Sequence, residues 1–232
     1  MIRLGVVGLG SRLGSLVDGF REAADGQLRV VGVVDPDEAG ARSRLAECDR
    51  SDARFYPDLP ALVRDARPDA LAIGTRCNLH APYAIQAARY DLPLFLEKPV
   101  ATSMRQAVAL ERTFARTRCR VVVSFPLRVS PLCEITRRYV AEGAIGRPEH
   151  VLGVNYVPYG TCYFDCFYRE FRVTQGLFLQ KATHDFDYLM YLMDSRITRV
   201  GAMAAWGRVF GGKKRAGLTC DRCGEADRCL ES

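Results

Sequence analysis

Two separate groups of side chains have the residue types and spacing that acid–base chemistry requires. The first is the segment LFLEKPV, in which an apolar run ends at Glu97, Lys98 and Pro99. Because lysine and glutamate are rarely buried without partners, this segment places two charges at the edge of a hydrophobic core. In α/β enzymes such an edge is where the chemistry takes place.

The second group is the segment KATHDFDYL, which carries Lys181, His184 and Asp187. His184 and Asp187 are three residues apart, so they share one face if the segment is helical. A histidine side chain has a reference pKa of about 6.5 and is suited to accept a proton near neutral pH. A histidine beside an apolar stripe is more often structural, and the residues alone leave both interpretations open.

A glycine-rich segment near the N-terminus has the pattern of a phosphate-binding turn. Gly8-Leu9-Gly10-Ser11-Arg12-Leu13-Gly14 follows an apolar run and precedes a helical pattern, although its third glycine comes one residue late. In this context glycines permit a tight turn and a close approach to a pyrophosphate, which the free amides of the helix N-terminus bind. The expected dinucleotide contacts here are Gly8, Gly10, Ser11, Arg12 and Leu13.

Asp35 ends the next apolar run, about 20 residues after the glycine-rich segment. At that position a carboxylate can accept hydrogen bonds from the ribose hydroxyls of a dinucleotide, and it repels a 2′-phosphate. The sequence therefore predicts NAD as the cofactor in preference to NADP.

Alternating strand and helix patterns must position these groups. Apolar runs predict six strands, at residues 2–7, 28–34, 54–56, 70–73, 92–96 and 120–124. Helical patterns lie between them, at residues 13–24, 36–47, from Asp58 onwards, 80–90 and 103–117. Strands that alternate with crossover helices form an α/β fold, and we expect a doubly wound parallel sheet of the Rossmann type.

The pattern changes after Ser124. Helices are expected at residues 131–142 and 178–193, a turn at 143–148, and strands at 149–156 and 197–206. We therefore expect three parts: a dinucleotide-binding domain at 1–124, a partial α+β domain with an open sheet at 125–210, and a cysteine-containing, loop-like or disordered tail at 211–232.

Composition argues against several other classes of protein. The net charge of +6 comes from arginines spread along the chain without a nucleic-acid-binding motif, so no nucleic-acid partner is expected. No apolar run approaches the ~20 residues of a membrane span. Nine cysteines, an odd number, and an N-terminus without a signal-peptide pattern indicate reduced thiols and a cytoplasmic location.

The cysteines of the tail form a CxxC pair with a third cysteine beyond it: Cys220, Cys223 and Cys229. A structural zinc site needs four ligands, so the sequence favours free thiols over a bound metal.

In the order and identity of its motifs the chain resembles the Gfo/Idh/MocA oxidoreductases, a family named for glucose–fructose oxidoreductase and inositol dehydrogenase. The resemblance runs from Met1 to about Trp206. It rests on VVGLGSRLG, on Asp35, on the run GTRCNLHAPYAIQAARYDLPLFLEKPVA, and on the segments LRVSP, EGAIGRPEH and HDFD. It implies a sugar or polyol substrate and a homo-oligomer.

The resemblance also implies roles for individual residues. Hydride would pass between nicotinamide and a hydroxyl-bearing carbon of a sugar or cyclitol, with Lys98 bound to the reacting oxygen and His184 taking its proton. The residues implied on the nicotinamide side are Thr75, Asn78, His80, Glu97 and Lys98. The implied substrate contacts are Arg128, Tyr168, Arg169, Arg172 and Lys181.

Two departures from the family pattern keep alternatives open. Many relatives carry an acidic residue four positions before the histidine, whereas this chain has Gln180, which can orient His184 but cannot stabilise an imidazolium by charge. Asp187 is then the candidate for that role. The second domain is also short, so we expect a C-terminally truncated member. The alternatives are a non-redox glycosidase or lyase with tightly held NAD, and a nucleotide-binding module without catalysis.

Overall fold

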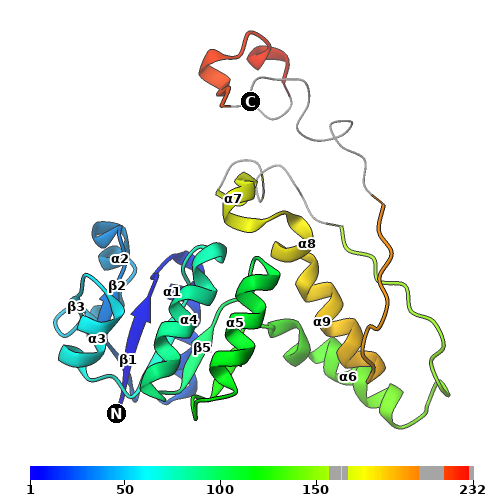
Figure 1. Cartoon of the computed structure of the whole chain (residues 1–232), viewed down its shortest axis with the longest axis horizontal. Helices are drawn as coiled ribbons and strands as arrows, with labels where there is room; N and C mark the ends of the chain where they lie inside the picture. The colour runs from blue at the N-terminus through cyan, green and yellow to red at the C-terminus, as the bar shows by residue number, and fades with distance from the viewer. Residues whose placement is uncertain (157–162, 164–166, 204–216, 230–232) are drawn as a thin grey trace.

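A computed structural model describes residues 1–156, 163, 167–203 and 217–229 of the chain (Figure 1). Six parallel strands form one sheet in the order β3-β2-β1-β4-β5-β6. The strands are β1 (Ile2–Val7), β2 (Leu28–Val34), β3 (Arg54–Phe55), β4 (Ala70–Ile73), β5 (Leu94–Leu96) and β6 (Val121–Val123). The strand order reverses between β1 and β4, which confirms the doubly wound Rossmann sheet.

Helices cover both faces of this sheet. They are α1 (Ser11–Ala23), α2 (Glu38–Ser43), α3 (Leu59–Ala66), α4 (His80–Ala87) and α5 (Met104–Phe114). Side chains alternate along β1, so Val6 faces a core layer that includes Leu13 of α1, while Val7 faces a layer that includes Leu62 of α3. Leu110 of α5 belongs to the second layer. The sheet is therefore buried on both sides, as a parallel sheet requires.

The helix ends follow from local residues. Asp58 begins α3 by accepting a hydrogen bond from the Ala61 amide at 2.8 Å, and Ser103 begins α5 by accepting from Gln106 at 3.2 Å. The helix expected at 36–47 is shorter than the pattern indicated, because α2 ends at Ser43 and a 3₁₀ turn, η1 (Glu47–Asp49), follows. Two other 3₁₀ turns, η2 (Cys77–Leu79) and η3 (Ala88–Tyr90), flank α4.

After Ser124 the only regular elements among the described residues are helices and 3₁₀ turns. They are η4 (Pro126–Val129), α6 (Pro131–Ala141), η6 (Phe167–Arg169), α7 (Phe171–Thr174), α8 (Leu177–Gln180), α9 (Ala182–Met193), η7 (Cys220–Arg222) and η8 (Ala226–Arg228). Helices α6 and α9 pack side by side (Figure 1). The helix expected at 178–193 is divided into α8 and α9 at Lys181. The expected turn at 143–148 is confirmed, and Gly143 and Gly146 have positive φ there.

The prediction of two strands after Ser124 is wrong for the residues that the structure describes. Residues 149–156 and 197–203 form no strand, and residues 204–206 lie outside the described part of the chain. The apolar alternation is present, but no segment among the described residues hydrogen-bonds to it as a ladder, and a strand needs such a neighbour. The segment 149–156 instead lies along α9, where Asn155 donates a hydrogen bond to Asp185 at 2.9 Å.

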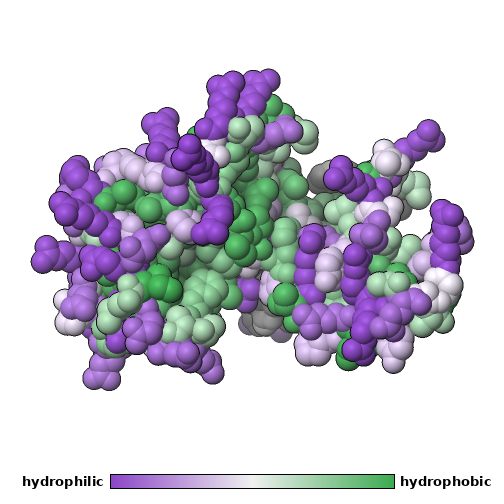
Figure 2. All heavy atoms as spheres, turned by 90° about the horizontal axis from the view of Figure 1, so that it is seen from below, coloured by the Kyte–Doolittle hydropathy of each residue, from purple (hydrophilic) through white to green (hydrophobic). Residues whose placement is uncertain are grey.

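The expected open sheet is thus not formed by the described residues. Of the expected tail, residues 217–229 contain two short 3₁₀ turns, while 211–216 and 230–232 lie outside the described residues. Polar side chains cover most of the face seen from below, and apolar atoms reach the surface in its middle (Figure 2). Within the described ranges, no helix has the length and apolar character that would cross a bilayer.

Candidate active site

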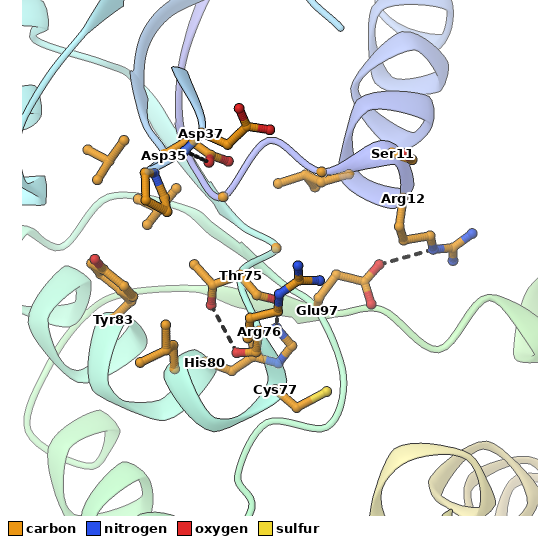
Figure 3. A pocket seen from close by; sticks show the side chains of 18 of the residues that line it. Ser11, Arg12, Asp35, Asp37, Thr75, Arg76, Cys77, His80, Tyr83 and Glu97 are labelled. Carbon is orange, nitrogen blue, oxygen red and sulfur yellow. Dashed lines mark hydrogen bonds and ion pairs between the residues drawn. The ribbon is translucent and has the colours of Figure 1, made fainter. Parts of the chain in front are cut away.

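A cavity of ≈ 1250 Å³ lies at the carboxyl ends of the parallel strands (Figure 3). Its wall brings together the glycine-rich segment, Asp35, Lys98 and His184. In an open α/β sheet, ligands bind at the place where the strand order reverses, and this cavity lies there. The three groups of residues that the sequence singled out therefore share one site.

The glycine-rich segment forms the cavity wall next to α1. Gly8 has a φ of +80°, and a Cβ atom there would lie 2.7 Å from the backbone of Thr75, so only glycine fits. Gly10 precedes α1, and no side chain caps the free amides of the first turn. Ser11 and Arg12 of that turn line the cavity. An uncapped N-terminus of a 13-residue helix suits the pyrophosphate of a dinucleotide.

Asp35 is fixed by backbone amides at the end of β2. One carboxylate oxygen accepts from the Leu9 amide at 2.8 Å, and the other accepts from the Asp37 amide at 2.9 Å. Each oxygen keeps a second lone pair for a ribose hydroxyl. Sequence reasoning missed Arg44, which lines the same region and approaches Asp37 at 4.0 Å.

The contacts of Glu97 explain why a charged residue follows the buried strand β5. It is only 6% exposed and accepts hydrogen bonds from the Arg12 side chain at 3.3 Å and from the Ser124 hydroxyl at 2.9 Å. The Lys98 amide donates to its second oxygen at 3.1 Å. Glu97 thereby joins α1 to the ends of β5 and β6, and its buried charge is paired with the exposed Arg12 and the buried Ser124.

Lys98 reaches from β5 to the helical half of the chain. Its Nζ atom donates a hydrogen bond to the backbone carbonyl of Gln180 at 2.7 Å. Burial lowers the pKa of the Lys98 ammonium group. The contact places this ammonium group at the junction between the sheet and α8.

His184 lies in the first turn of α9 and contributes to the cavity wall. The edge of its ring meets the ring of Phe125, with centroids 5.7 Å apart. Burial, and then the positive charges of Lys98 and Lys181, lower the pKa of His184 to about 4. Its Nδ1 atom and the side-chain oxygen of Gln180 are both buried without a hydrogen-bond partner among the described residues. The imidazole is therefore neutral at pH 7.

Asp187 faces a different partner from the one expected. Its two carboxylate oxygens accept hydrogen bonds from the Arg128 guanidinium at 2.7 and 2.5 Å. Asp187 is thus engaged by Arg128 of η4, and the pair ties η4 to α9. These contacts do not support the expectation that the Asp187 carboxylate stabilises a protonated His184.

Of the other expected nicotinamide-side residues, Thr75 and His80 line the cavity. His80 is buried, with its ring nitrogens 2.8 Å from the Pro99 carbonyl and 3.0 Å from the Thr75 carbonyl, and burial lowers its pKa. Asn78 is not in the cavity wall, and its side-chain oxygen is buried without a partner among the described residues.

Of the expected substrate contacts, the structure brings Tyr168 to the cavity wall. The four that lie outside the wall are Arg128, Arg169, Arg172 and Lys181. Arg172 forms an ion pair with Glu170 at 2.8 Å. Lining residues that sequence reasoning missed include Arg44, Arg76, Cys77, Tyr83 and Phe167. Arg76, Cys77 and Tyr83 lie within three residues of Thr75 or His80, so their position in sequence could have indicated them. No local sequence signal marks Phe167.

The three tail cysteines are free thiols: Cys220 and Cys229 are exposed and Cys223 is half-buried. Across the described parts of the chain, no three histidine, cysteine or acidic side chains gather closely enough to hold a metal ion.

Comparison with known proteins gives two matches to family models. Residues 2–125 match the model described as "Oxidoreductase family, NAD-binding Rossmann fold", and residues 134–217 match the model "GFO/IDH/MocA C-terminal domain".

Individual relatives are distant but extend over most of the chain. The inositol 2-dehydrogenase of Acidothermus cellulolyticus is 28% identical over 213 residues, which cover 88% of this chain and 57% of the relative. The myo-inositol 2-dehydrogenase of Thermotoga maritima is 25% identical over 202 residues, covering 87% and 58%. The crystal structure of myo-inositol dehydrogenase from Lactobacillus casei in complex with NAD(H) and myo-inositol has a TM-score of 0.65 at 21% identity, covering 84% of this chain and 55% of that one. The chain therefore spans little more than half the length of these relatives.

Proposed function

This chain belongs to the GFO/IDH/MocA oxidoreductase family, and on that premise we propose that it is an NAD-dependent dehydrogenase. The proposed reaction transfers a hydride between nicotinamide and a hydroxyl-bearing carbon of a sugar or cyclitol. One observation carries the proposal: Lys98 and His184, from distant parts of the sequence, line the same cavity as the glycine-rich segment and Asp35. A dinucleotide in this cavity would present its reactive end to both side chains.

The residues of the cavity fit a dinucleotide. Uncapped amides of α1 suit its pyrophosphate, and Asp35 suits its adenosine ribose. Two further carboxylates, Asp37 and Glu38, line the same region. Arg44 approaches Asp37 at 4.0 Å and Arg42 pairs with Glu38 at 2.6 Å, so three carboxylates face two positive charges and Asp35 is the one without a basic partner among the described residues. This excess of negative charge supports a preference for NAD over NADP, because it repels a 2′-phosphate.

The catalytic roles rest on Lys98 and His184. When bound, NAD supplies the hydride acceptor. The Lys98 ammonium group would hydrogen-bond the substrate oxygen and stabilise the negative charge that develops there. The neutral imidazole of His184 would accept the hydroxyl proton. Asp187 would act only indirectly: its ion pair with Arg128 of η4 holds α9, and with it His184, in position.

Inositol dehydrogenases among the relatives favour a cyclitol or a related sugar as substrate. The Tyr168 ring in the cavity wall suits the apolar face of such a ligand. Seven free cysteines among the described residues support a cytoplasmic location. Exposed apolar side chains on α6, including Leu132 and Ile135, support a homo-oligomer.

NADH absorbance during incubation with NAD and a panel of cyclitols and sugars tests the proposal. We expect NADH to form with at least one compound, and Lys98→Ala protein is the control for contaminating dehydrogenases. Binding of NADH without turnover of any compound would contradict the dehydrogenase assignment. The non-redox alternative instead predicts NAD that remains bound through purification, whereas the neutral Gln180 favours the other alternative, a nucleotide-binding module without catalysis.

A further inference from the structure

Arg76 and Phe167 form a contact across the mouth of the cavity. Arg76 lies in the loop after β4 and is exposed, whereas Phe167 belongs to η6 in the helical half of the chain. The guanidinium carbon of Arg76 lies 3.5 Å from the centroid of the Phe167 ring. Both residues line the cavity, so the contact joins its β4-loop wall to the helical half of the chain.

This contact leaves the hydrogen-bonding edges of the guanidinium free. A guanidinium stacked on an aromatic ring uses its face, while its N–H groups point outward in the plane. No ion pair links Arg76 to an acidic residue within the described ranges. Glu97, the acidic side chain drawn closest in Figure 3, is already bound by Arg12, Ser124 and the Lys98 amide. Arg76 therefore offers a positive charge to the cavity.

The position of Arg76 indicates what that charge would bind. Figure 3 shows Arg76 projecting into the cavity between Thr75 and Glu97, toward the loop that leads to Ser11. The N-terminus of α1 on that side offers backbone amides and about half a positive charge, and the charge of Arg12 in its first turn is offset by Glu97, whereas a pyrophosphate carries two negative charges. A planar guanidinium fork is the side chain best suited to supply the missing charge to phosphate oxygens.

We propose that Arg76, held on the ring of Phe167, binds the pyrophosphate of the dinucleotide from the side opposite α1. This inference rests on the proposed function only in requiring a bound dinucleotide. It adds a side chain from the β4 loop to the cofactor contacts, and it gives the helical half of the chain a part in holding the cofactor. An anionic group on the substrate is the competing occupant.

Calorimetric titration of the full chain with NADH and with ADP separates these occupants. ADP carries the two phosphates and the adenosine but has no nicotinamide half. We expect Arg76→Met to weaken NADH and ADP by a similar factor of about ten, the scale of one charge-assisted hydrogen bond. The factor should shrink as salt is raised, because the contact is exposed and screened. Phe167→Leu should weaken both ligands less.

Arg89→Met is the matched control, because Arg89 is an exposed arginine in η3, beyond the end of α4 that is remote from His80, and it does not line the cavity. It should leave both affinities unchanged. Loss of NADH affinity without loss of ADP affinity would place Arg76 at the nicotinamide half, and unchanged affinity for both ligands would leave the substrate as its partner; either result would overturn the inference. Wild-type protein that binds neither ligand would overturn the proposed function itself, which distinguishes the two failures.

Discussion

The side chain of Leu13 packs directly against Gly74, at the point where α1 crosses the end of β4. A Cβ atom on Gly74 would lie 2.8 Å from both the Cβ and the Cδ2 atoms of Leu13. In the dinucleotide-binding pattern the third glycine allows close packing of the helix on the sheet. Here the helix carries a leucine, Leu13, at that position, and the glycine, Gly74, lies at the end of β4 instead. The helix can therefore still pack closely on the sheet, because the residue without a side chain is on the strand rather than on the helix.

Gly74→Ala should therefore destabilise the fold and weaken cofactor binding. The added methyl group would overpack the contact with the fully buried Leu13, which costs about 1–3 kcal/mol of unfolding free energy. Urea unfolding and NADH titration measure the two effects. Gly19→Ala in the same helix is the matched control, because its Cβ would meet nothing within 4 Å and alanine favours a helix by about 0.5–1 kcal/mol. Equal stability of the two variants would refute the packing argument.

Asp35→Ala should weaken NADH more than NADPH. The substitution removes the proposed ribose acceptor and also the hydrogen bond that holds the Leu9 amide. Hydrogen bonds to a charged group contribute about 1.5–3 kcal/mol, so the loss of NADH affinity should be about 10-fold to 100-fold. Isothermal titration with both cofactors measures it. Tighter binding of NADPH than NADH to the wild-type protein would show that the assigned preference is wrong.

Lys98→Ala and His184→Ala should lose turnover while keeping cofactor affinity. Both side chains are assigned to the reacting carbon and oxygen, away from the pyrophosphate and adenosine. General acid–base groups typically contribute about 10²–10⁴-fold to the rate. Steady-state kinetics with a substrate found in the panel, together with NADH titration, separates kcat from binding. A variant that retains a near-normal kcat would remove that residue from the mechanism.

The titration of His184 is predicted to lie well below that of an ordinary histidine. Burial and the charges of Lys98 and Lys181 lower its pKa to about 4, whereas the unfolded chain titrates near 6.5. A depressed folded-state pKa means that this group's contribution to stability is complete above pH 6.5 and is lost as pH falls toward 4. Because the chain has only three histidines, NMR can follow His184 directly.

Gln180→Glu tests the electrostatic origin of that shift. A carboxylate four residues before His184 would stabilise the imidazolium, so the NMR midpoint should rise toward the ordinary value. Gln180→Leu is the control, because it removes the amide without adding charge, and its midpoint should stay low. A wild-type midpoint near 6.5 would contradict the burial argument, and an unchanged midpoint in Gln180→Glu would place the new carboxylate away from the imidazole.

Arg128→Met should destabilise the protein more than Asp187→Asn. Asp187 is buried, so loss of Arg128 leaves its carboxylate without its partner, whereas Arg128 is 44% exposed and remains hydrated after loss of Asp187. Partial exposure reduces the effect below that of a fully buried pair, and we expect about 1–2 kcal/mol of unfolding free energy for Arg128→Met. Chemical denaturation of both variants measures the order. The reverse order would refute the assignment of Asp187 as the buried partner.

Features that depend on short stretches of chain were predictable from the sequence. Alternating apolar runs and turn residues indicated the Rossmann sheet, and capping residues such as Asp58 and Ser103 marked helix starts. Gly8, Asp35 and Lys98 line the cavity because the carboxyl ends of parallel strands meet at one edge of the sheet. His184 also lines it, but it comes from α9, whose position no strand pattern gives. Their chemical roles stay predictions.

The features that only the tertiary structure decided are pairings between distant residues. Three such pairs are Leu13 with Gly74, Asp187 with Arg128, and Arg76 with Phe167. In each pair, the local sequence around one residue does not predict which residue it will contact. The strand expected at 149–156 failed for the same reason. Its alternation describes one strand, but a strand exists only when a second segment supplies hydrogen bonds, and residues 149–156 lie against α9 instead. Periodicity is a property of one segment, whereas a ladder, an ion pair or a close contact belongs to two.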